Sequence, residues 1–203
     1  MESLIIKEIR QEDIDEFIKI LMKVYEDKFK IIFKSKMEKS QDVLIQEMRI
    51  REKLDGNFIV VADGLLVGAM TIKIRETQQN FIQALNIFLK NLGLYHGLRS
   101  FFIGGYHQSI SDRYIRKDAC YIENVFVLPG YRRKGIGKKL MMQAEESAKK
   151  RNKKFLYGFV ETTNHNSISL CLRSGFKKIG IKKNIFTKLF FGVPGWIYFK
   201  KSL

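Results

Sequence analysis

The stretch Val125-Phe-Val-Leu-Pro-Gly-Tyr-Arg-Arg-Lys-Gly-Ile-Gly-Lys-Lys-Leu140 decides how we interpret this chain. An apolar run ends at Pro129-Gly130, basic residues and two spaced glycines follow, and a helical apolar pattern then begins. This order predicts a strand, a loop and a helix. Backbone amides at a helix N-terminus converge on an anion, and the helix dipole favours negative charge there. The stretch therefore predicts a loop that binds phosphate.

The residues of this loop suit a pyrophosphate. Gly135 and Gly137 remove side chains where the backbone has to approach a ligand closely. Four basic residues add positive charge for the flanking phosphates, and these are Arg132, Arg133, Lys134 and Lys138. Two commoner nucleotide loops do not fit. Ile136 stands where a Walker loop has lysine, and Leu140 stands where a dinucleotide loop has its third glycine.

The charge of the chain is concentrated in its second half. The net charge is +16, with 37 Lys and Arg against 21 Asp and Glu. Residues 1–76 hold 14 basic and 15 acidic residues, and the remainder holds 23 basic and 6 acidic residues. A basic half suits an anionic ligand, an acidic partner or nucleic acid, although a lysine-rich surface can also serve solubility alone.

The composition indicates one ordinary globular domain. The chain has 203 residues, of which 45% are hydrophobic, and it contains only 2 prolines. No apolar run approaches the length of a membrane span, and no leader pattern occurs at the start, so we expect a cytoplasmic protein that does not enter a membrane. Cys120 and Cys171 are far apart, and the three histidines lack ligand spacing, so we expect reduced thiols and no metal.

The apolar periodicity predicts α/β architecture, as a mixed α/β or α+β domain around one sheet, in a single domain over residues 1–203. A first strand and two helices lead to a hairpin around Asp63-Gly64, and strands and helices alternate after residue 120. Residues 77–119 form a helical insert before the fourth strand. Its stripe of apolar residues predicts packing on the sheet, with a lid over a substrate pocket or a homodimer face as alternatives.

Two motifs together resemble the GNAT superfamily of N-acetyltransferases. The first is Arg-x-x-Gly-x-Gly at Arg132–Gly137, directly after Val-x-Val-x-Pro. The second is Asn164-His-Asn-Ser-Ile-Ser-Leu-Cys-Leu-Arg-Ser-Gly-Phe176, which is similar to the family's Asn-x-x-Ala-x-x-Leu-Tyr-x-x-x-Gly-Phe. The match is strong over about residues 120–180 and rests on element order before them. It implies the family's acyl-CoA N-acyltransferase fold, with a mostly antiparallel central sheet flanked by helices.

The resemblance implies acetyl-CoA as cosubstrate and assigns its contacts. Backbone amides from Arg133 to Lys138 would hold the pyrophosphate, and this range includes Lys134, Gly135, Ile136 and Gly137. The pantetheine arm would run beside Val125 and Val127, and Asn164 would bind it through its side-chain amide. The amide of Val127 would also stabilise the oxyanion that develops on the acetyl carbonyl.

Glu123 is the candidate general base for the attacking amine. It stands four residues before Val127, and so on the same face of a regular strand. The histone-acetylating branch of the resembled family places its base carboxylate at this position. The alternative is a carboxylate paired with a nearby lysine or arginine.

Cys171 stands where the resembled family commonly has the tyrosine that protonates the leaving thiolate. A thiol could donate this proton, because its ordinary pKa is about 8.5. A small packing residue is the alternative, and water, Tyr121 or Tyr157 could then act as the acid.

The resemblance implies an amine acceptor, which in the resembled fold enters past residues 12–54, 77–119 and 183–195. The aromatic content of these segments and an acidic cluster near residue 12 favour a small-molecule amine, with a protein lysine or N-terminus as the second candidate. Two other classes remain as alternatives, namely a CoA-binding module without turnover and a nucleic-acid-binding protein. The aromatics of the basic half lie in apolar runs, which disfavours stacking on bases.

Overall fold

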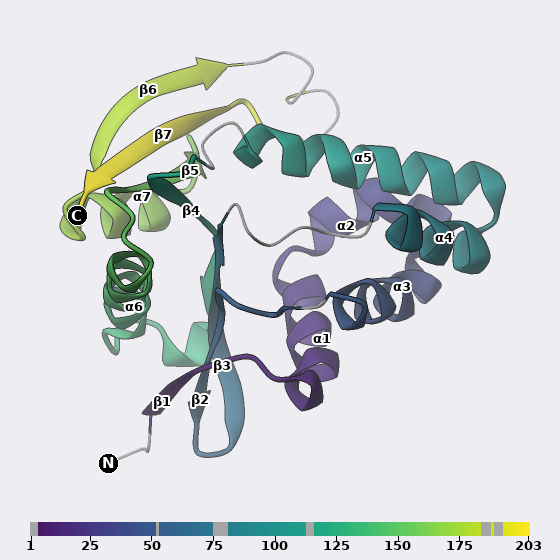
Figure 1. Cartoon of the computed structure of the whole chain (residues 1–203), viewed down its shortest axis with the longest axis horizontal. Coiled ribbons are helices and arrows are strands. Elements are labelled where there is room, and N and C mark those ends of the chain that lie inside the picture. The colour runs from purple at the N-terminus through teal and green to yellow at the C-terminus, as the bar shows by residue number, and fades with distance from the viewer. Residues whose placement is uncertain (1–3, 52, 75–80, 113–115, 184–187, 189–192) are drawn as a thin grey trace. The chain divides into compact units, whose positions relative to one another are not determined.

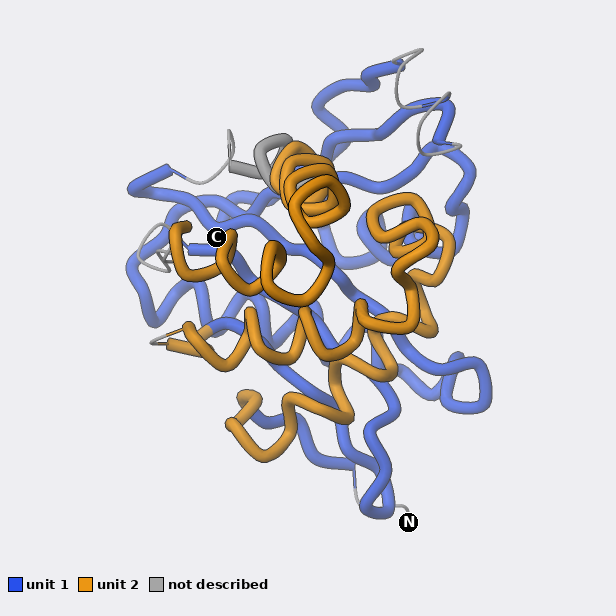
Figure 2. Tube along the Cα trace, turned by 90° about the vertical axis from the view of Figure 1, so that its right-hand side faces the viewer, with its two compact units in different colours: residues 1–7, 56–75, 113–203 blue, residues 8–55, 76–112 orange. Residues whose placement is uncertain are grey.

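The computed structural model describes residues 4–51, 53–74, 81–112, 116–183, 188 and 193–203, and Figure 1 shows its elements. The chain divides into two compact units (Figure 2). We call residues 1–7, 56–75 and 113–203 the sheet unit, and residues 8–55 and 76–112 the helical unit. Each is described by itself.

The sheet unit is built on seven strands in the order β1-β2-β3-β4-β5-β7-β6. The strands are β1 (Leu4–Glu8), β2 (Asn57–Ala62), β3 (Leu65–Lys73), β4 (Ala119–Val127), β5 (Phe155–Glu161), β6 (Lys177–Lys183) and β7 (Gly195–Ser202). Strand β4 pairs with β5 in parallel, whereas β2–β3, β3–β4, β5–β7 and β6–β7 are antiparallel. The expected mixed, mostly antiparallel sheet is therefore confirmed.

The predicted hairpin between β2 and β3 is present. Asp63 and Gly64 connect the strands with φ angles of 50° and 81°. A two-residue turn with both φ angles positive matches the twist of the flanking strands, and Asp and Gly tolerate this conformation better than other residues do. The sequence signal was strong here because the turn is local.

Helix α6 (Ile136–Lys150) forms the core of the sheet unit with β3, β4 and β5. Its buried residues recur at helical spacing and belong to one hydrophobic cluster with Met70 of β3, Cys120 of β4 and Leu156 of β5. Helix α7 (His165–Arg173) lies next to β6 and also contributes partly buried residues to this cluster. These two helices flank the sheet within its own unit.

The helical unit contains five α-helices among its described residues. They are α1 (Ile14–Val24), α2 (Glu26–Phe33), α3 (Met37–Arg49), α4 (Phe81–Leu92) and α5 (Leu94–Asp112). The sequence indicated α1 and α3, but it gave no separate signal for α2. Within this unit Arg99 donates hydrogen bonds to the carbonyls of Ile32 and Ile31 at 2.8 and 3.1 Å, which caps the C-terminus of α2.

Helices α4 and α5 supply the expected helical insert before the fourth strand. Helix α4 ends at Gly93, which has a φ of 77°. The two helices approach closely at Gly97, where an added Cβ would lie 2.8 Å from the carbonyl oxygen of Phe88. Phe88 is 8% exposed, whereas Phe81 and Tyr95 are 61% and 72% exposed. The predicted apolar stripe is therefore buried only in part.

No helix among the described residues is both long enough and apolar enough to cross a membrane. Segment 183–195, which we expect the acceptor to pass, falls largely on residues 184–187 and 189–192, which lie outside the described part of the chain.

Candidate active site

The loop between β4 and α6 has the backbone of an anion-binding turn. Pro129–Tyr131 form a short 3-10 turn after β4, and Arg133 and Gly135 then adopt φ angles of 63° and 79°. Gly135 is the N-cap of α6, and an ordinary side chain at its φ angle would be strained. Alternating backbone conformations of this kind turn successive N–H groups toward one side.

The first hydrogen bond of α6 lies beyond the loop. Lys139 donates its N–H to the carbonyl of Gly135 at 3.1 Å. The amides of Ile136, Gly137 and Lys138 precede it, and the first amides of any helix have no partner inside that helix. The side chains of Arg133, Lys134 and Lys138 are exposed beside them. The site thus combines a helix N-terminus with basic side chains, as phosphate binding requires.

Arg132 connects the loop to the strand. Its Nε donates a hydrogen bond to the carbonyl of Val127 at 2.9 Å. The amide of Leu128 donates to the carbonyl of Val67 at 2.8 Å, which holds the end of β4 on β3. Arg132 therefore has a structural contact in addition to the phosphate contact that the sequence predicted for it.

The two glycines have different surroundings. Nothing lies within 4 Å of a Cβ built on Gly135, and its φ angle of 79° is a second reason for glycine at this position. A Cβ on Gly137 would lie 3.2 Å from Cδ2 of Leu170 in α7. The missing side chain of Gly137 therefore also makes room for α7, and the role predicted for both glycines in ligand approach stays a prediction.

Strands β4 and β5 separate soon after they meet. Their ladder consists of the pairs Ala119–Phe155, Cys120–Leu156 and Tyr121–Tyr157. Beyond these pairs β4 continues to Val127 on β3, and β5 continues to Glu161 on β7. Val125 and Val127, which we expect beside the pantetheine arm, lie on the part of β4 beyond this ladder, where their side chains pack on the core.

Strand β4 contains a bulge that the sequence did not reveal. Ala69 is opposite Phe126 and Thr71 is opposite Glu123, so two steps along β3 match three steps along β4. Asn124 lies in this segment with a φ of 53°. Asn adopts this left-handed conformation more readily than other non-glycine residues. The polar pair Glu123-Asn124 inside an otherwise apolar strand was the available signal.

The bulge contradicts the prediction that Glu123 and Val127 share a face. Glu123 is opposite Thr71 and Val127 is opposite Gly68, and these two residues of β3 are three apart. Directly opposed residues share a face, and faces alternate along a strand, so the two side chains lie on opposite faces. The prediction was wrong because it assumed a regular strand. The Val127 amide is unaffected as an oxyanion candidate, because backbone amides lie near the plane of the sheet.

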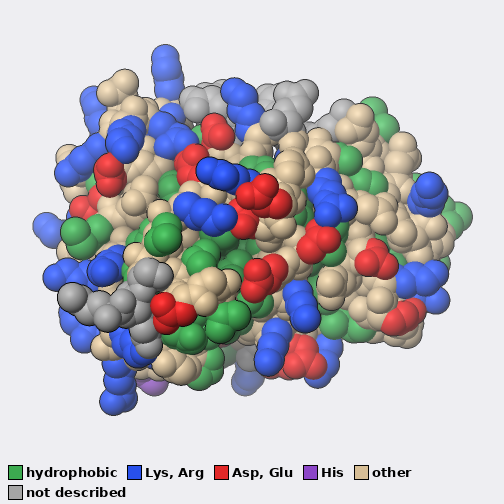
Figure 3. Space-filling view, turned by 90° about the horizontal axis from the view of Figure 1, so that it is seen from below, with side chains coloured by type: hydrophobic (Ala, Val, Ile, Leu, Met, Phe, Trp, Pro, Cys, Tyr) green, Lys and Arg blue, Asp and Glu red, His purple; other side chains and the backbone are tan. Residues whose placement is uncertain are grey.

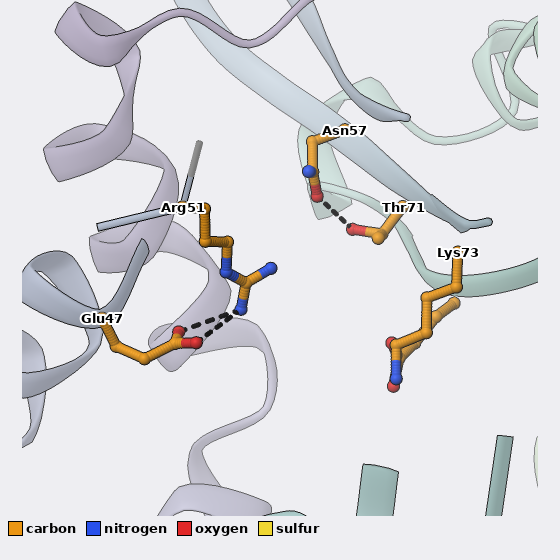
Figure 4. A network of polar contacts seen from close by, with 6 residues as sticks. Glu47, Arg51, Asn57, Thr71 and Lys73 are labelled. Atoms are coloured by element: carbon orange, nitrogen blue, oxygen red, sulfur yellow. Dashed lines mark hydrogen bonds and ion pairs between the residues drawn. The ribbon is translucent and has the colours of Figure 1, made fainter. Parts of the chain in front are cut away.

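Glu123 forms the ion pair that the sequence left open as its alternative role. Its Oε2 lies 3.1 Å from Nζ of Lys73, and the two side chains are 12% and 17% exposed. Lys73 stands on β3 two residues after Thr71, so the two side chains lie on the same face of the sheet. Thr71 donates a hydrogen bond to Asn57 Oδ1 at 2.9 Å (Figure 4). The positive charge of Lys73 balances the negative charge of Glu123. Both side chains lie on the face of the sheet away from α6. Sequence reasoning missed Lys73, because only the strand register brings it to Glu123.

Asn164 is the N-cap of helix α7. Its Oδ1 accepts a hydrogen bond from the amide of Ser167 at 3.1 Å, which is the usual capping contact. The residue is exposed, and its Nδ2 group is the part of the side chain that can donate to a ligand carbonyl. The oxygen of Asn164 therefore caps α7, and the contact of its Nδ2 group with the cosubstrate stays a prediction.

Cys171 is largely enclosed in α7 against the core. Burial raises the pKa of its thiol to about 11. A thiol with this pKa gives up its proton less readily than an ordinary thiol does, so proton donation to a CoA thiolate is unfavourable. Tyr121, one of the tyrosines considered as alternatives, is 2% exposed, and its ring centroid lies 5.4 Å from that of Phe159.

No metal centre is apparent in the described part of the chain, since no three His, Cys, Asp or Glu residues are placed to hold an ion. The functional candidates are therefore the loop, the opening between β4 and β5, and the Glu123–Lys73 pair.

Comparisons with known proteins agree with this geometry. The acetyltransferase (GNAT) family model matches residues 14–176, which is more than half of the chain. A search of curated proteins found no match. Many solved structures share the fold. An acetyltransferase has a TM-score of 0.65 at 16% identity, with 98% of both chains covered. A GNAT-family acetyltransferase from Streptococcus pneumoniae has a TM-score of 0.58 at 15% identity, with 99% of both chains covered.

A third structure carries a ligand. It is YncA, a putative acetyltransferase from Salmonella typhimurium with its cofactor acetyl-CoA, and it has a TM-score of 0.61 at 15% identity over 99% of this chain and 94% of that one. At such identities the structures show the fold alone, whereas the family model covers most of the sequence. The protein is an acyltransferase. It belongs to the GNAT acetyltransferase family.

Proposed function

We propose that this protein transfers an acetyl group from acetyl-CoA to the primary amine of a small molecule, by direct attack in a ternary complex. The observation that carries the proposal is the strand–loop–helix at the open end of β4. It joins a helix N-terminus, two residues with positive φ and exposed basic side chains in the GNAT family's Arg-x-x-Gly-x-Gly motif. Acetyl-CoA supplies the activated thioester.

The residues of the loop and of β4 bind and polarise the cosubstrate. The amides from Arg133 to Lys138 hold the pyrophosphate, and the basic side chains balance its charge. The backbone at Val125 and Val127 receives the pantetheine arm, and Nδ2 of Asn164 donates to one of its carbonyls. The Val127 amide donates to the acetyl oxygen as negative charge develops there.

Glu123 takes up the proton that the acceptor amine loses, through a water molecule. Lys73 lies 3.1 Å from Oε2 of this carboxylate and balances its negative charge. The new N–C bond forms, the C–S bond breaks, and the CoA thiolate leaves and takes its proton from bulk solvent. Because burial raises the pKa of Cys171 to about 11, its thiol has no special advantage as the proton donor.

The acceptor class is the least constrained part of the proposal. A ribosomal-protein-alanine N-acetyltransferase from Brucella melitensis shares this fold with a TM-score of 0.59 at 18% identity, over 98% of this chain and 99% of that one. That likeness shows the fold alone, and a protein lysine or N-terminus stays the second candidate. Thiol release in the presence of free amino acids, of diamines and of a peptide with an N-terminal alanine distinguishes a small-molecule acceptor from a protein acceptor.

Thermal unfolding with acetyl-CoA, CoA and a duplex oligonucleotide tests the cosubstrate. A ligand at 100 times its dissociation constant adds about 2.7 kcal/mol to the free energy of unfolding. We expect stabilisation by both CoA forms and none by the oligonucleotide. Stabilisation by the oligonucleotide alone would contradict the proposal. Stabilisation by acetyl-CoA without thiol release from any amine would instead indicate a binding module without turnover.

A further inference from the structure

Strand β6 forms an exposed, strongly basic edge of the sheet. It is the last strand in the sheet order and pairs on one side with β7. On its other side it pairs with no strand in the part of the chain that the structure describes. Its sequence is Lys-Lys-Ile-Gly-Ile-Lys-Lys from Lys177 to Lys183, and every residue except Gly180 is exposed. The strand therefore presents four lysines and a row of backbone groups.

Protection against aggregation explains the lysines but not the centre of the strand. Lysine on an edge strand discourages pairing with other chains. Ile179 and Ile181 are each 49% exposed at the centre of the same edge. Ile179 lies at a register shift between Lys178 and Gly180, whereas Ile181 pairs regularly with Ile197. Both isoleucines leave apolar surface at this edge, which lysines and a bulge alone would not require and which suits strand addition at Ile181. The strand is thus apolar at its centre and positively charged at both ends.

A second copy of β6 does not suit this edge. The sequence is the same in both directions around Gly180. Antiparallel pairing of two copies about Gly180 would place Lys178 near Lys182 of the other copy and Lys177 near Lys183. Parallel pairing in register would place each lysine beside the same lysine of the other copy. Like charges directly opposite each other destabilise paired strands. The charge pattern therefore favours an acidic occupant over a second copy.

Nucleic acid also matches this edge poorly. Phosphates would contact the lysines, but single-stranded binding sites add aromatic side chains on which bases stack, and β6 has none. The isoleucines would gain nothing from a phosphate backbone. An extended peptide can use all three features, because its backbone pairs with the strand edge, its apolar centre covers the isoleucines and its acidic ends meet the lysines.

We propose that β6 is a docking edge for an extended acidic segment of a partner protein, with apolar residues at the centre of the segment and Asp or Glu on both sides. The segment adds to the sheet beside β6, which is separated from β5 by β7 in the sheet order. The surface is separate from the candidate acetyl-CoA site and does not depend on the proposed acetyl transfer. Figure 3 shows many exposed Lys and Arg side chains on the molecule, so the test has to separate β6 from general positive charge.

Fluorescence anisotropy with a labelled peptide of sequence EEVTVEE tests the proposal on the intact protein. Lys177→Glu combined with Lys178→Glu should weaken binding at least tenfold, because two attractive contacts become repulsive. Lys149→Glu with Lys150→Glu is the matched control, since it changes the same charge at exposed positions of α6. We expect the control to bind within twofold of the unmodified protein.

Two further measurements test the strand geometry. The peptide EEPTPEE has the same charge but cannot donate backbone hydrogen bonds at its prolines, so it should bind at least tenfold more weakly. Ile181→Thr keeps strand propensity but removes apolar contact, and it should weaken EEVTVEE several-fold. Equal weakening by both lysine pairs, equal binding of both peptides, or tighter β6-dependent binding of a single-stranded oligonucleotide would each overturn the proposal.

Discussion

The sheet unit and the helical unit differ in charge but not in their use of aromatic packing. The sheet unit has 24 Lys and Arg against 7 Asp and Glu, whereas the helical unit has 13 against 14. In the helical unit the ring centroids of Phe33 and Phe88 are 6.0 Å apart, and in the sheet unit Phe159 contacts three other rings. Every residue that we expect to bind acetyl-CoA lies in the sheet unit. The excess positive charge therefore lies with the residues that we expect to bind an anionic cosubstrate, and the helical unit is close to neutral.

Glu123→Gln gives the largest effect expected in the sheet unit. Turnover should fall by about 10²–10⁴-fold, because a general base contributes that much, while stabilisation by acetyl-CoA persists. Thiol release and thermal unfolding measure the two quantities. Glu145→Gln is the matched control, since Glu145 is also partly buried and paired with a lysine, Lys201. Full turnover in Glu123→Gln would exclude the role of Glu123 as base.

Phe88→Ala tests the other side of the comparison. Phe88 is 8% exposed and contacts two other rings, so its truncation should cost about 3 kcal/mol or more of unfolding free energy. Chemical denaturation measures this loss, and acetyl-CoA should still stabilise the variant. Phe81→Ala is the control, because Phe81 is 61% exposed and should cost much less. Loss of acetyl-CoA binding in Phe88→Ala would show that the helical unit takes part in it.

Gly135→Asp should weaken acetyl-CoA binding by at least tenfold. The new side chain is strained at a φ of 79°, and its carboxylate repels a pyrophosphate. Gly64→Asp has a matching φ of 81° and an equally open environment in the same unit, so it controls for backbone strain. Titration calorimetry measures both. Equal losses in the two variants would mean that strain, rather than the loop, accounts for the effect.

Asn164→Ala should cost about 1 kcal/mol of stability through loss of the α7 cap. Asn164→Ser keeps an oxygen that can cap the helix but removes the amide that can donate to pantetheine. We expect serine to restore stability without restoring affinity for acetyl-CoA. Recovery of both would indicate that Asn164 acts only as a cap.

Cys171→Ala should have the smallest effect, with turnover within about twofold of the unmodified protein. A thiol with a pKa of about 11 remains protonated at neutral pH, so its alkylation should be slow there and should accelerate as the pH rises toward 11. Iodoacetamide labelling followed by mass spectrometry measures this. Lost turnover in Cys171→Ala would restore Cys171 as the acid, and rapid labelling at pH 7 would contradict the raised pKa.

The sequence predicted those features that depend on residues close together in the chain. The Asp63-Gly64 hairpin, the glycine loop and the order of strands and helices all carry local signals. The bulge at Asn124, the Lys73–Glu123 pair and the contact of Gly137 with Leu170 depend on neighbours in space. Strand register decides which side chains share a face, and the register of a sheet cannot be read from a single sequence. From the sequence, the role of Glu123 could therefore be predicted only as one of two alternatives, a general base or a member of an ion pair.

The short ladder between β4 and β5 has a consequence for how such a sequence can diverge. Backbone groups pair the two strands at only three positions, and the side chains there, such as Cys120 and Leu156, are buried in the core. Substitutions at these positions therefore have to keep an apolar side chain of similar size, but their identity can change. The opening that follows depends on two strands that separate, which many different apolar sequences can provide. Solved structures at 15–16% identity that align over nearly the whole chain are what such tolerance produces.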